Sequence, residues 1–210
     1  MMIKDSLTDN RTILRNYYRF QSMIYDTTRW SFLFGRNEIL DIIAAGETPR
    51  HLLEIGCGTG YNLKKLAERH PDAQLTGMDV SDDMLGIARK KLTPYPNTKL
   101  IEGAYASDEI RFRTPPDMIL FSYVLTMINP HYSKVILQAY EDLAPGGKIA
   151  VIDFHSTGVN WFKQHMANNH VRMDAHLNPI LEMSFAPIRD EVRKAYFGLW
   201  NYFLFIGEKC

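Results

Sequence analysis

The stretch LLEIGCGTGYN at residues 52–62 decides the fold, because it joins an apolar run to a helical pattern through three glycines spaced two apart. The run HLLEI (51–55) has the length and apolar content of a buried strand, and NLKKLAERH (62–70) has the periodicity of an amphipathic helix. A glycine-rich turn from a strand to a helix is where doubly wound α/β proteins bring ligands against the backbone. The stretch therefore predicts both a fold class and a binding site.

The alternation of strand and helix continues along the chain. Short apolar runs alternate with amphipathic segments, and Ser81 is placed to cap a helix at its N-terminus. We expect strands at 74–79, 98–103, 117–125 and 147–154, and helices at 82–92 and 132–143. Strands separated by helices predict right-handed crossovers and a parallel sheet with helices on both faces.

The two ends of the chain depart from this alternation. Residues 185–196 and 199–209 have the pattern of two strands around Gly198, which predicts a C-terminal antiparallel hairpin. The expected fold is therefore α/β, with a doubly wound, mostly parallel sheet of seven strands. Residues 1–45 have a helical pattern and predict a cap over the active site, with residues 46–210 forming the ligand-binding domain.

Composition and charge exclude several classes of function. The chain has 210 residues, 46% of them hydrophobic, and a formal net charge of zero, which gives no field to gather nucleic acid. Its two cysteines, Cys57 and Cys210, form no disulfide or metal framework. The N-terminus lacks the apolar core of a secretory signal, and no run approaches the roughly 20 apolar residues of a membrane span. We expect a cytoplasmic protein, with peripheral contact at the inner face of the membrane as an alternative.

The glycine turn argues against phosphate-bearing ligands. A phosphate-binding loop needs Lys and Ser or Thr after the last glycine, where this chain has Tyr61 and Asn62. A dinucleotide fingerprint needs its third glycine at position 61, whereas the glycines here are more closely spaced. Glu54 would repel a pyrophosphate but could receive an ammonium group. The expected ligand carries a cation and no phosphate.

The next strand end adds a sugar to this ligand. Asp79 follows the glycines by about twenty residues, where a carboxylate can accept both hydroxyls of a ribose. Val80 and Met84 offer apolar surface to one face of a base. S-adenosylmethionine combines an amine, a ribose and a purine without a phosphate, so we expect it as the cofactor.

Three motifs, LLEIGCGTG, GMDVS and LAPGGKIAVIDF, resemble those of the class I S-adenosylmethionine-dependent methyltransferases. The resemblance implies a Rossmann-like fold in which the glycine turn approaches the methionine part, Glu54 helps to hold its amino group, and Asp79 binds the ribose. Many members place Asp after the third strand to meet adenine, and this chain has Ala104 there. The implied cofactor residues are Glu54, Gly56, Cys57, Gly58, Gly60, Asp79, Val80, Met84, Ala104, Tyr105 and Ser122, with backbone groups near Tyr105 or the Ser107 hydroxyl recognising adenine.

Three further blocks are similar to a narrower group of enzymes. Residues 17–40, 169–181 and 198–209 resemble the N-methyltransferases that trimethylate the diacylglyceryl-homoserine headgroup of bacterial betaine lipids. The resemblance implies a lipid amine as acceptor, and it implies that Tyr25 closes over the cofactor. Phospholipid N-methyltransferases are near relatives of this group.

The acceptor side is expected to combine aromatic rings with a few polar groups. Methyl transfer is an in-line displacement that needs alignment more than a strong base, and aromatic faces stabilise a methylated cation by roughly 0.5–2 kcal/mol each. The aromatic candidates are Tyr17, Tyr18, Tyr25, Trp30, Phe32, Tyr123 and Trp161. We expect catalytic roles for Tyr25, Tyr123 and His155, and substrate contacts from Arg29, Trp30, His170 and Arg172.

Competing interpretations remain at several of these positions. Arg172 and Asp174 fit a local ion pair as well as headgroup contacts. His165, His170 and His176 lack the accompanying Cys or carboxylates of a metal site, so no metal is expected.

The function also has alternatives. One is a soluble methyltransferase acting on carbon or oxygen of a small molecule such as a quinone precursor, and another is a phospholipid N-methyltransferase. A third is a catalytically silent module that binds the cofactor alone.

Overall fold

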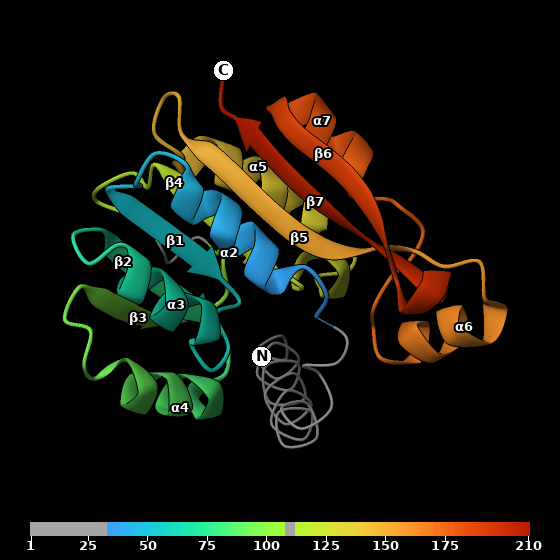
Figure 1. The fold of residues 1–210 in the computed structure, drawn as a ribbon, viewed down its shortest axis with the longest axis horizontal. Coiled ribbons are helices and arrows are strands. Elements are labelled where there is room, and N and C mark those ends of the chain that lie inside the picture. The colour runs from blue at the N-terminus through green and yellow to red at the C-terminus, as the bar shows by residue number, and fades with distance from the viewer. Residues whose placement is uncertain (1–32, 108–111) are drawn as a thin grey trace, which may run out of the picture.

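The computed structural model describes residues 33–107 and 112–210, and its centre is a seven-stranded sheet in the order β3-β2-β1-β4-β5-β7-β6 (Figure 1). The first five strands are parallel, and β7 pairs antiparallel with both β5 and β6. The strands are β1 (His51–Ile55), β2 (Gln74–Asp79), β3 (Thr98–Glu102), β4 (Met118–Ser122), β5 (Lys148–Ser156), β6 (Ala186–Ala195) and β7 (Trp200–Glu208). This arrangement confirms the predicted fold class.

Helices cover both faces of the sheet, because side chains alternate between the two faces along each strand. Leu52 of β1 belongs to the core cluster under α2, α3, α4 and α6, whereas its neighbour Leu53 belongs to the cluster under α5 and α7. The helices are α2 (Arg36–Ala45), α3 (Tyr61–Arg69), α4 (Asp82–Leu92), α5 (Tyr132–Asp142), α6 (Asn160–Asn168) and α7 (Asn178–Ser184), and two 3₁₀ turns are η2 (Leu125–Met127) and η3 (Tyr196–Gly198).

Most predicted elements lie within one or two residues of the observed ones. The Ser81 hydroxyl oxygen accepts the Met84 N–H at 3.3 Å, which confirms the N-cap of α4. The strand predicted over 117–125 is shorter in the structure, because the backbone turns at Tyr123 with a φ of 57° and then enters η2. Helices α6 and α7 were not predicted. Each is short and buries only two residues, which is too few to show a helical period in the sequence.

Helix α2 is the described end of the predicted N-terminal cap. Its residues Ile39, Leu40 and Ile43 are buried in the same core cluster as β1 and α3. The remainder of the cap lies outside the described residues. The proposed division between residues 1–45 and 46–210 stays a prediction.

Candidate active site

A pocket of about 600 Å³ lies at the carboxyl ends of β1, β2 and β4. Its walls come from the turns that follow these strands, as expected for a doubly wound sheet. It contains most of the residues predicted to bind a cofactor: Gly56, Cys57, Gly58, Asp79, Val80, Met84, Ala104, Tyr105 and Ser122 line it, and Glu54 and Gly60 do not.

The glycine turn requires its glycines for two different reasons. All three have left-handed backbone, with φ of 68° at Gly56, 52° at Gly58 and 72° at Gly60. A Cβ at Gly56 would lie 2.6 Å from Val124 Cγ2, and one at Gly60 would lie 3.1 Å from Ala88 Cβ. A Cβ at Gly58 would meet no atom within 4 Å, since this residue faces the pocket. Gly56 and Gly60 therefore close the packing around the turn, and Gly58 leaves room for a ligand.

Asp79 fixes the turn to the end of β2. Its Oδ2 accepts the Gly58 N–H at 2.8 Å, and its Oδ1 accepts the Ser81 N–H at 2.9 Å. A carboxylate offers about four acceptor positions, so these two bonds orient the group and leave capacity for hydroxyl donors in the pocket. The predicted ribose contact stays a prediction, and the position of Asp79 on the pocket wall supports it.

Glu54 reaches the pocket through other side chains. It is buried, and its Oε1 accepts the Asn62 Nδ2 at 2.6 Å, while the Asn62 Oδ1 accepts the Arg36 Nε at 2.6 Å. Burial raises the pKa of Glu54 to about 8, and the nearby Arg36 and the Asn62 amide oppose that shift. Glu54 thus orients Asn62 and Arg36, and of these three Arg36 lines the pocket.

Arg36 is a pocket residue that the sequence reading missed. Its guanidinium carbon lies 4.3 Å from the centre of the Tyr61 ring, which also lines the pocket. It is the first residue of α2 and follows Gly35, whose φ is 72° and where a Cβ would lie 2.6 Å from Tyr202 Cε2. The sequence shows a glycine before this arginine, but no spacing pattern predicts that Arg36 contacts Asn62. An arginine here gives the pocket a donor fork for a carboxylate.

The adenine side of the expected ligand would meet a largely apolar wall. Ala104 lines the pocket at the position where many relatives have Asp, so that side chain supplies no acceptor. The Tyr105 hydroxyl donates to Asp142 Oδ2 at 2.7 Å, and burial raises the pKa of Tyr105. Burial likewise raises the pKa of the Cys57 thiol, which keeps it neutral.

Tyr123 lines the pocket, and its hydroxyl donates to the Phe34 carbonyl oxygen at 2.5 Å. Its ring meets Phe154 edge to face at 4.8 Å between centroids. Burial raises the pKa of Tyr123 well above its ordinary value, so the hydroxyl stays protonated. Through its hydrogen bond to Phe34, Tyr123 positions the backbone next to Leu33, which also lines the pocket.

Asp153 fixes the part of the pocket wall that is formed by η2. It is fully buried within β5, where its Oδ1 accepts the Thr126 hydroxyl at 2.5 Å and its Oδ2 accepts the Thr126 N–H at 3.2 Å. The Phe154 N–H also donates to Oδ1, at 2.8 Å. Burial raises the pKa of Asp153 to about 6, against the effect of these donors. Thr126 lies in η2, so Asp153 positions the turn that brings Met127 to the pocket.

His155, His170 and Arg172 do not line the pocket. The His155 Nδ1 lies 2.9 Å from the Ser156 Oγ, and burial lowers its pKa. The carbonyl oxygen of His170 accepts the Asn129 Nδ2 at 3.3 Å. The structure therefore does not bring the predicted catalytic His155 together with Tyr123 at one site, and the roles predicted for His155, His170 and Arg172 have no support from their positions.

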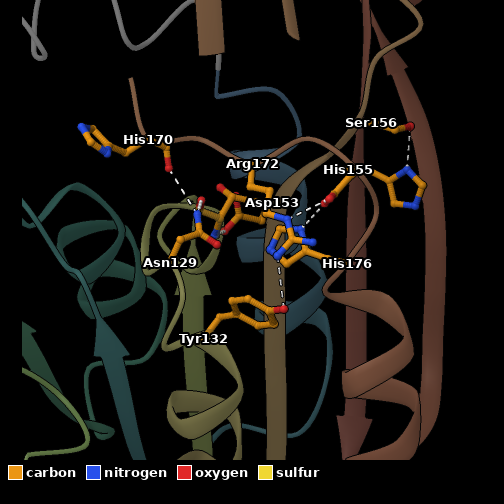
Figure 2. A network of polar contacts seen from close by, with 10 residues as sticks. Asn129, Tyr132, Asp153, His155, Ser156, His170, Arg172 and His176 are labelled. Carbon is orange, nitrogen blue, oxygen red and sulfur yellow. Dashed lines mark hydrogen bonds and ion pairs between the residues drawn. The ribbon is translucent and has the colours of Figure 1, made fainter. Parts of the chain in front are cut away.

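Arg172 forms the local ion pair that competed with a headgroup contact. Figure 2 shows it among polar side chains that come from β5 and from the segments before and after that strand. Its Nε donates to Asp174 Oδ2 at 2.8 Å, and its Nη1 lies 3.4 Å from the Tyr132 hydroxyl. The Asp174 Oδ1 lies 2.6 Å from the His176 Nδ1. Both Arg172 and Asp174 remain partly exposed, so the pair contributes little to stability.

Other predicted site residues lie elsewhere. Trp161 projects from α6 with 65% of its surface exposed and does not line the pocket. Tyr25, Arg29 and Trp30 lie outside the described residues, as do Tyr17, Tyr18 and Phe32. In the part of the chain that the structure describes, no three His, Cys, Asp or Glu side chains gather as metal ligands. No helix among those described has the length and apolarity to cross a bilayer.

Comparison with known proteins agrees with this geometry. Residues 52–147 match the family described as methyltransferase domain. This stretch is therefore similar to methyltransferase domains, which supports S-adenosylmethionine as the cofactor. The matched residues include the glycine turn, Asp79, Ala104 and Tyr123.

Among curated proteins, the chain is similar to the trans-aconitate 2-methyltransferase of Methylobacterium nodulans, with 33% identity over 103 residues. That alignment covers 49% of this chain and 38% of the relative, so the likeness spans well under two thirds of the relative's length. The likeness is therefore limited to part of each protein.

Solved structures show the same fold over more of the chain. The N-methyltransferase NodS from Bradyrhizobium japonicum, in complex with S-adenosyl-L-homocysteine, has a TM-score of 0.69 at 17% identity, covering 83% of this chain and 85% of that one. The 1,6-didemethyltoxoflavin-N1-methyltransferase of Burkholderia thailandensis has a TM-score of 0.72 at 14% identity, covering 100% of this chain and 92% of that one. At these identities the likeness establishes the fold.

Proposed function

We propose that this protein transfers the methyl group of S-adenosylmethionine to the amino group of a lipid headgroup, with diacylglyceryl homoserine as the acceptor and a trimethylated betaine lipid as the product. The observation that carries the transfer is the pocket itself. It combines the glycine turn, Asp79 and Arg36 at the carboxyl ends of the strands, where the parts of S-adenosylmethionine have matching partners.

The chemistry of the pocket favours an acceptor that is already nucleophilic. Among the described residues that line it there is no histidine, and the sole carboxylate, Asp79, is bonded to backbone donors. The Tyr123 hydroxyl stays protonated. A neutral amine attacks the sulfonium methyl in line and needs alignment rather than deprotonation by a strong base. Transfer to carbon would require a proton acceptor that this set of residues does not supply.

The lipid part of the proposal is supported by the sequence blocks at 17–40, 169–181 and 198–209, which resemble the betaine-lipid enzymes. It is also supported by the apolar wall next to Tyr123, formed by Leu33, Val124, Met127 and Ile128. Such a wall suits a headgroup that carries glyceryl and acyl portions. Arg29 and Trp30 keep their proposed contacts with the acceptor, and Tyr25 its proposed place over the cofactor, on the sequence alone.

A second candidate is methylation of a carboxylate on a small acid. The curated relatives at 33% identity are trans-aconitate 2-methyltransferases, and a carboxylate also reacts without a general base. In this second candidate, Arg36 would bind the carboxylate of the acceptor rather than the carboxylate of the cofactor.

One experiment separates the candidates. The purified protein is incubated with methyl-labelled S-adenosylmethionine and, in parallel, with diacylglyceryl homoserine or phosphatidylethanolamine in detergent micelles and with trans-aconitate in solution. We expect label in the amine of the homoserine lipid, identified by mass spectrometry, and at least about tenfold less label with Asp79→Ala at a subsaturating concentration of cofactor. Preferential label in phosphatidylethanolamine or in trans-aconitate would refute the betaine-lipid proposal and leave the methyltransferase assignment in place.

A further inference from the structure

Three exposed aromatic side chains come from α6 and from the hairpin between β6 and β7, at the opposite edge of the sheet from β3. Phe197 and Tyr196 form the tip of the hairpin between β6 and β7, and Trp161 lies in the first turn of α6, next to that hairpin in Figure 1. Phe197 is fully exposed, Trp161 is 65% exposed and Tyr196 is 45% exposed. We refer to these three residues as the aromatic tip.

The aromatic tip is built on a rigid base. Phe162 of α6 stacks on Trp200 with 5.2 Å between ring centroids, and Tyr196 contacts the same Trp200 ring at 4.8 Å. The Thr157 hydroxyl donates to the Leu199 carbonyl oxygen at 2.6 Å, which ties the entry to α6 to the hairpin. Buried aromatic packing beneath the surface therefore fixes α6 and the hairpin together and presents the outer rings to solvent.

The backbone of the tip is unusual for such residues. Tyr196 has a φ of 44° and Phe197 a φ of 57°. Hairpin positions with positive φ favour Gly, Asn or Asp, and large aromatic residues there are strained. Strained backbone at two exposed aromatic residues is a feature of binding sites, so we infer that the two rings contact a binding partner.

Two exposed lysines flank the aromatic tip, and the carboxylates of Glu38 and Glu191 that approach the same hairpin are ion-paired with Arg193. Lys163 and Lys194 are exposed beside it, and the Lys194 Cδ would lie 3.9 Å from a Cβ at Gly198. Residues 157–172 and 192–207, which supply the tip and its base, contain no Asp or Glu. Exposed aromatic rings flanked by lysines, with the nearby Glu38 and Glu191 carboxylates paired to Arg193, fit the interface of a bilayer that carries anionic lipids.

The aromatic tip lies on the pocket side of the sheet. β7 begins where β5 ends, since Asn201 pairs with Ser156, and the pocket lies at the carboxyl ends of the strands parallel to β5. Tyr196 also contacts the Phe34 ring at 4.9 Å, and the Phe34 carbonyl accepts the hydroxyl of the pocket residue Tyr123. A membrane bound at the tip would thus face the same edge of the sheet as the pocket.

We propose that the aromatic tip, Trp161, Tyr196 and Phe197 with Lys163 and Lys194, inserts into the interface of an anionic lipid bilayer and holds the pocket toward the membrane. This inference rests on the proposed lipid acceptor, and it assigns membrane contact to α6 and the β6–β7 hairpin rather than to the N-terminal residues alone.

The test is co-sedimentation of the full chain with vesicles of phosphatidylcholine containing phosphatidylglycerol, and with phosphatidylcholine alone. We expect tighter binding to the anionic vesicles, weakened by salt. Phe197→Ser with Trp161→Ser should lower the partition coefficient at least about tenfold, given the area of the two rings, and Lys163→Glu should lower it about fivefold or more. Met183→Ser is the matched control, because Met183 is 87% exposed on α7 and lies outside the tip.

Circular dichroism checks that the variants fold. We expect them to fold, because most of the surface of the Phe197 and Trp161 side chains is exposed to solvent. Vesicle binding that is absent, unchanged in the double variant, or reduced equally by Met183→Ser would overturn the inference. So would a dimer that the double variant dissociates in analytical ultracentrifugation, since the tip would then serve a second copy of the chain.

Activity in detergent micelles separates this inference from the proposed function. The double variant should methylate the micellar lipid at the rate of the unmodified protein, because its substitutions lie outside the pocket. Vesicle binding without any methylation of the lipid would instead contradict the proposed acceptor and leave the membrane contact standing.

Discussion

Replacing Thr126 by valine tests whether Asp153 holds the pocket wall through a charged hydrogen bond. Thr126 is fully buried and donates both its hydroxyl, at 2.5 Å, and its N–H, at 3.2 Å, to the Asp153 carboxylate. Valine has nearly the same shape, so Thr126→Val removes the hydroxyl donor with little change in volume. A hydrogen bond to a charged group contributes about 1.5–3 kcal/mol, so we expect a loss of about 2 kcal/mol in the free energy of unfolding at pH 8.

The pH dependence gives this prediction its sign. Burial raises the pKa of Asp153 from an ordinary value of 3.8 to about 6. A raised folded pKa means that the contribution of this group to stability is fully present below its unfolded pKa and is lost as the pH rises through about 6. Thr126→Val should raise the folded pKa further, so more stability is lost above it. The difference between the two proteins should therefore be larger at pH 8 than at pH 5, by about 1 kcal/mol.

Urea denaturation at both pH values measures the difference directly, and a melting experiment should show a fall in Tm of about 4–8 °C at pH 8 for a chain of this size. Thr126→Ser is the matched control, because it keeps the hydroxyl and loses one buried methyl group, at a cost of about 1 kcal/mol that does not depend on pH. Equal losses in the two variants, or a loss in Thr126→Val that is the same at pH 5 and pH 8, would refute the assigned role of the Asp153 carboxylate.

Three further predictions concern binding. Asp79→Ala should weaken S-adenosylhomocysteine by about 1.5–3 kcal/mol in calorimetry through loss of a charged acceptor, and an unchanged affinity would mean that the ribose lies elsewhere. Arg36→Gln should weaken S-adenosylhomocysteine about tenfold but leave 5′-methylthioadenosine, which has no carboxylate, unaffected; equal weakening of both ligands would argue against a carboxylate at Arg36. Arg172→Lys should leave both the KM for the homoserine lipid and the cofactor affinity unchanged, since Arg172 lies outside the pocket in an ion pair with Asp174, and a raised KM for the lipid would show that Arg172 contacts the headgroup after all.

Agreement between sequence and structure is closest where the relevant physics is local. The periodicity of 51–55, 74–79 and 82–92 gave the observed bounds of β1, β2 and α4. Short elements were harder: α6 buries only Phe162 and Met166, which is too little pattern to separate a helix from a loop. The strand predicted through residue 125 ends earlier in the structure, at the left-handed turn of Tyr123. The sequence did not indicate this turn, because the residue there is not a glycine.

The candidate site divides in the same way. The glycine turn and Asp79 could be found from spacing, since consecutive parallel strands bring their carboxyl ends to one edge of the sheet. Arg36 and Thr126 could not, because their partners Asn62 and Asp153 lie 26 and 27 residues away along the chain. The histidine expected to act in catalysis, His155, lies within β5, which is two residues longer than the predicted strand at this end, and it does not line the pocket.

The sequence by itself determined the alternating strands and helices, the doubly wound sheet and the glycine turn that lines the pocket. These follow from hydrophobic periodicity and from backbone angles that glycine adopts freely, and both are properties of neighbouring residues. Only the tertiary structure decided that Glu54 acts through Asn62 and Arg36, and that an aromatic hairpin tip shares the pocket's edge of the sheet. Such pairings depend on which side chains meet when separate elements pack, and no pattern along a single segment encodes that meeting.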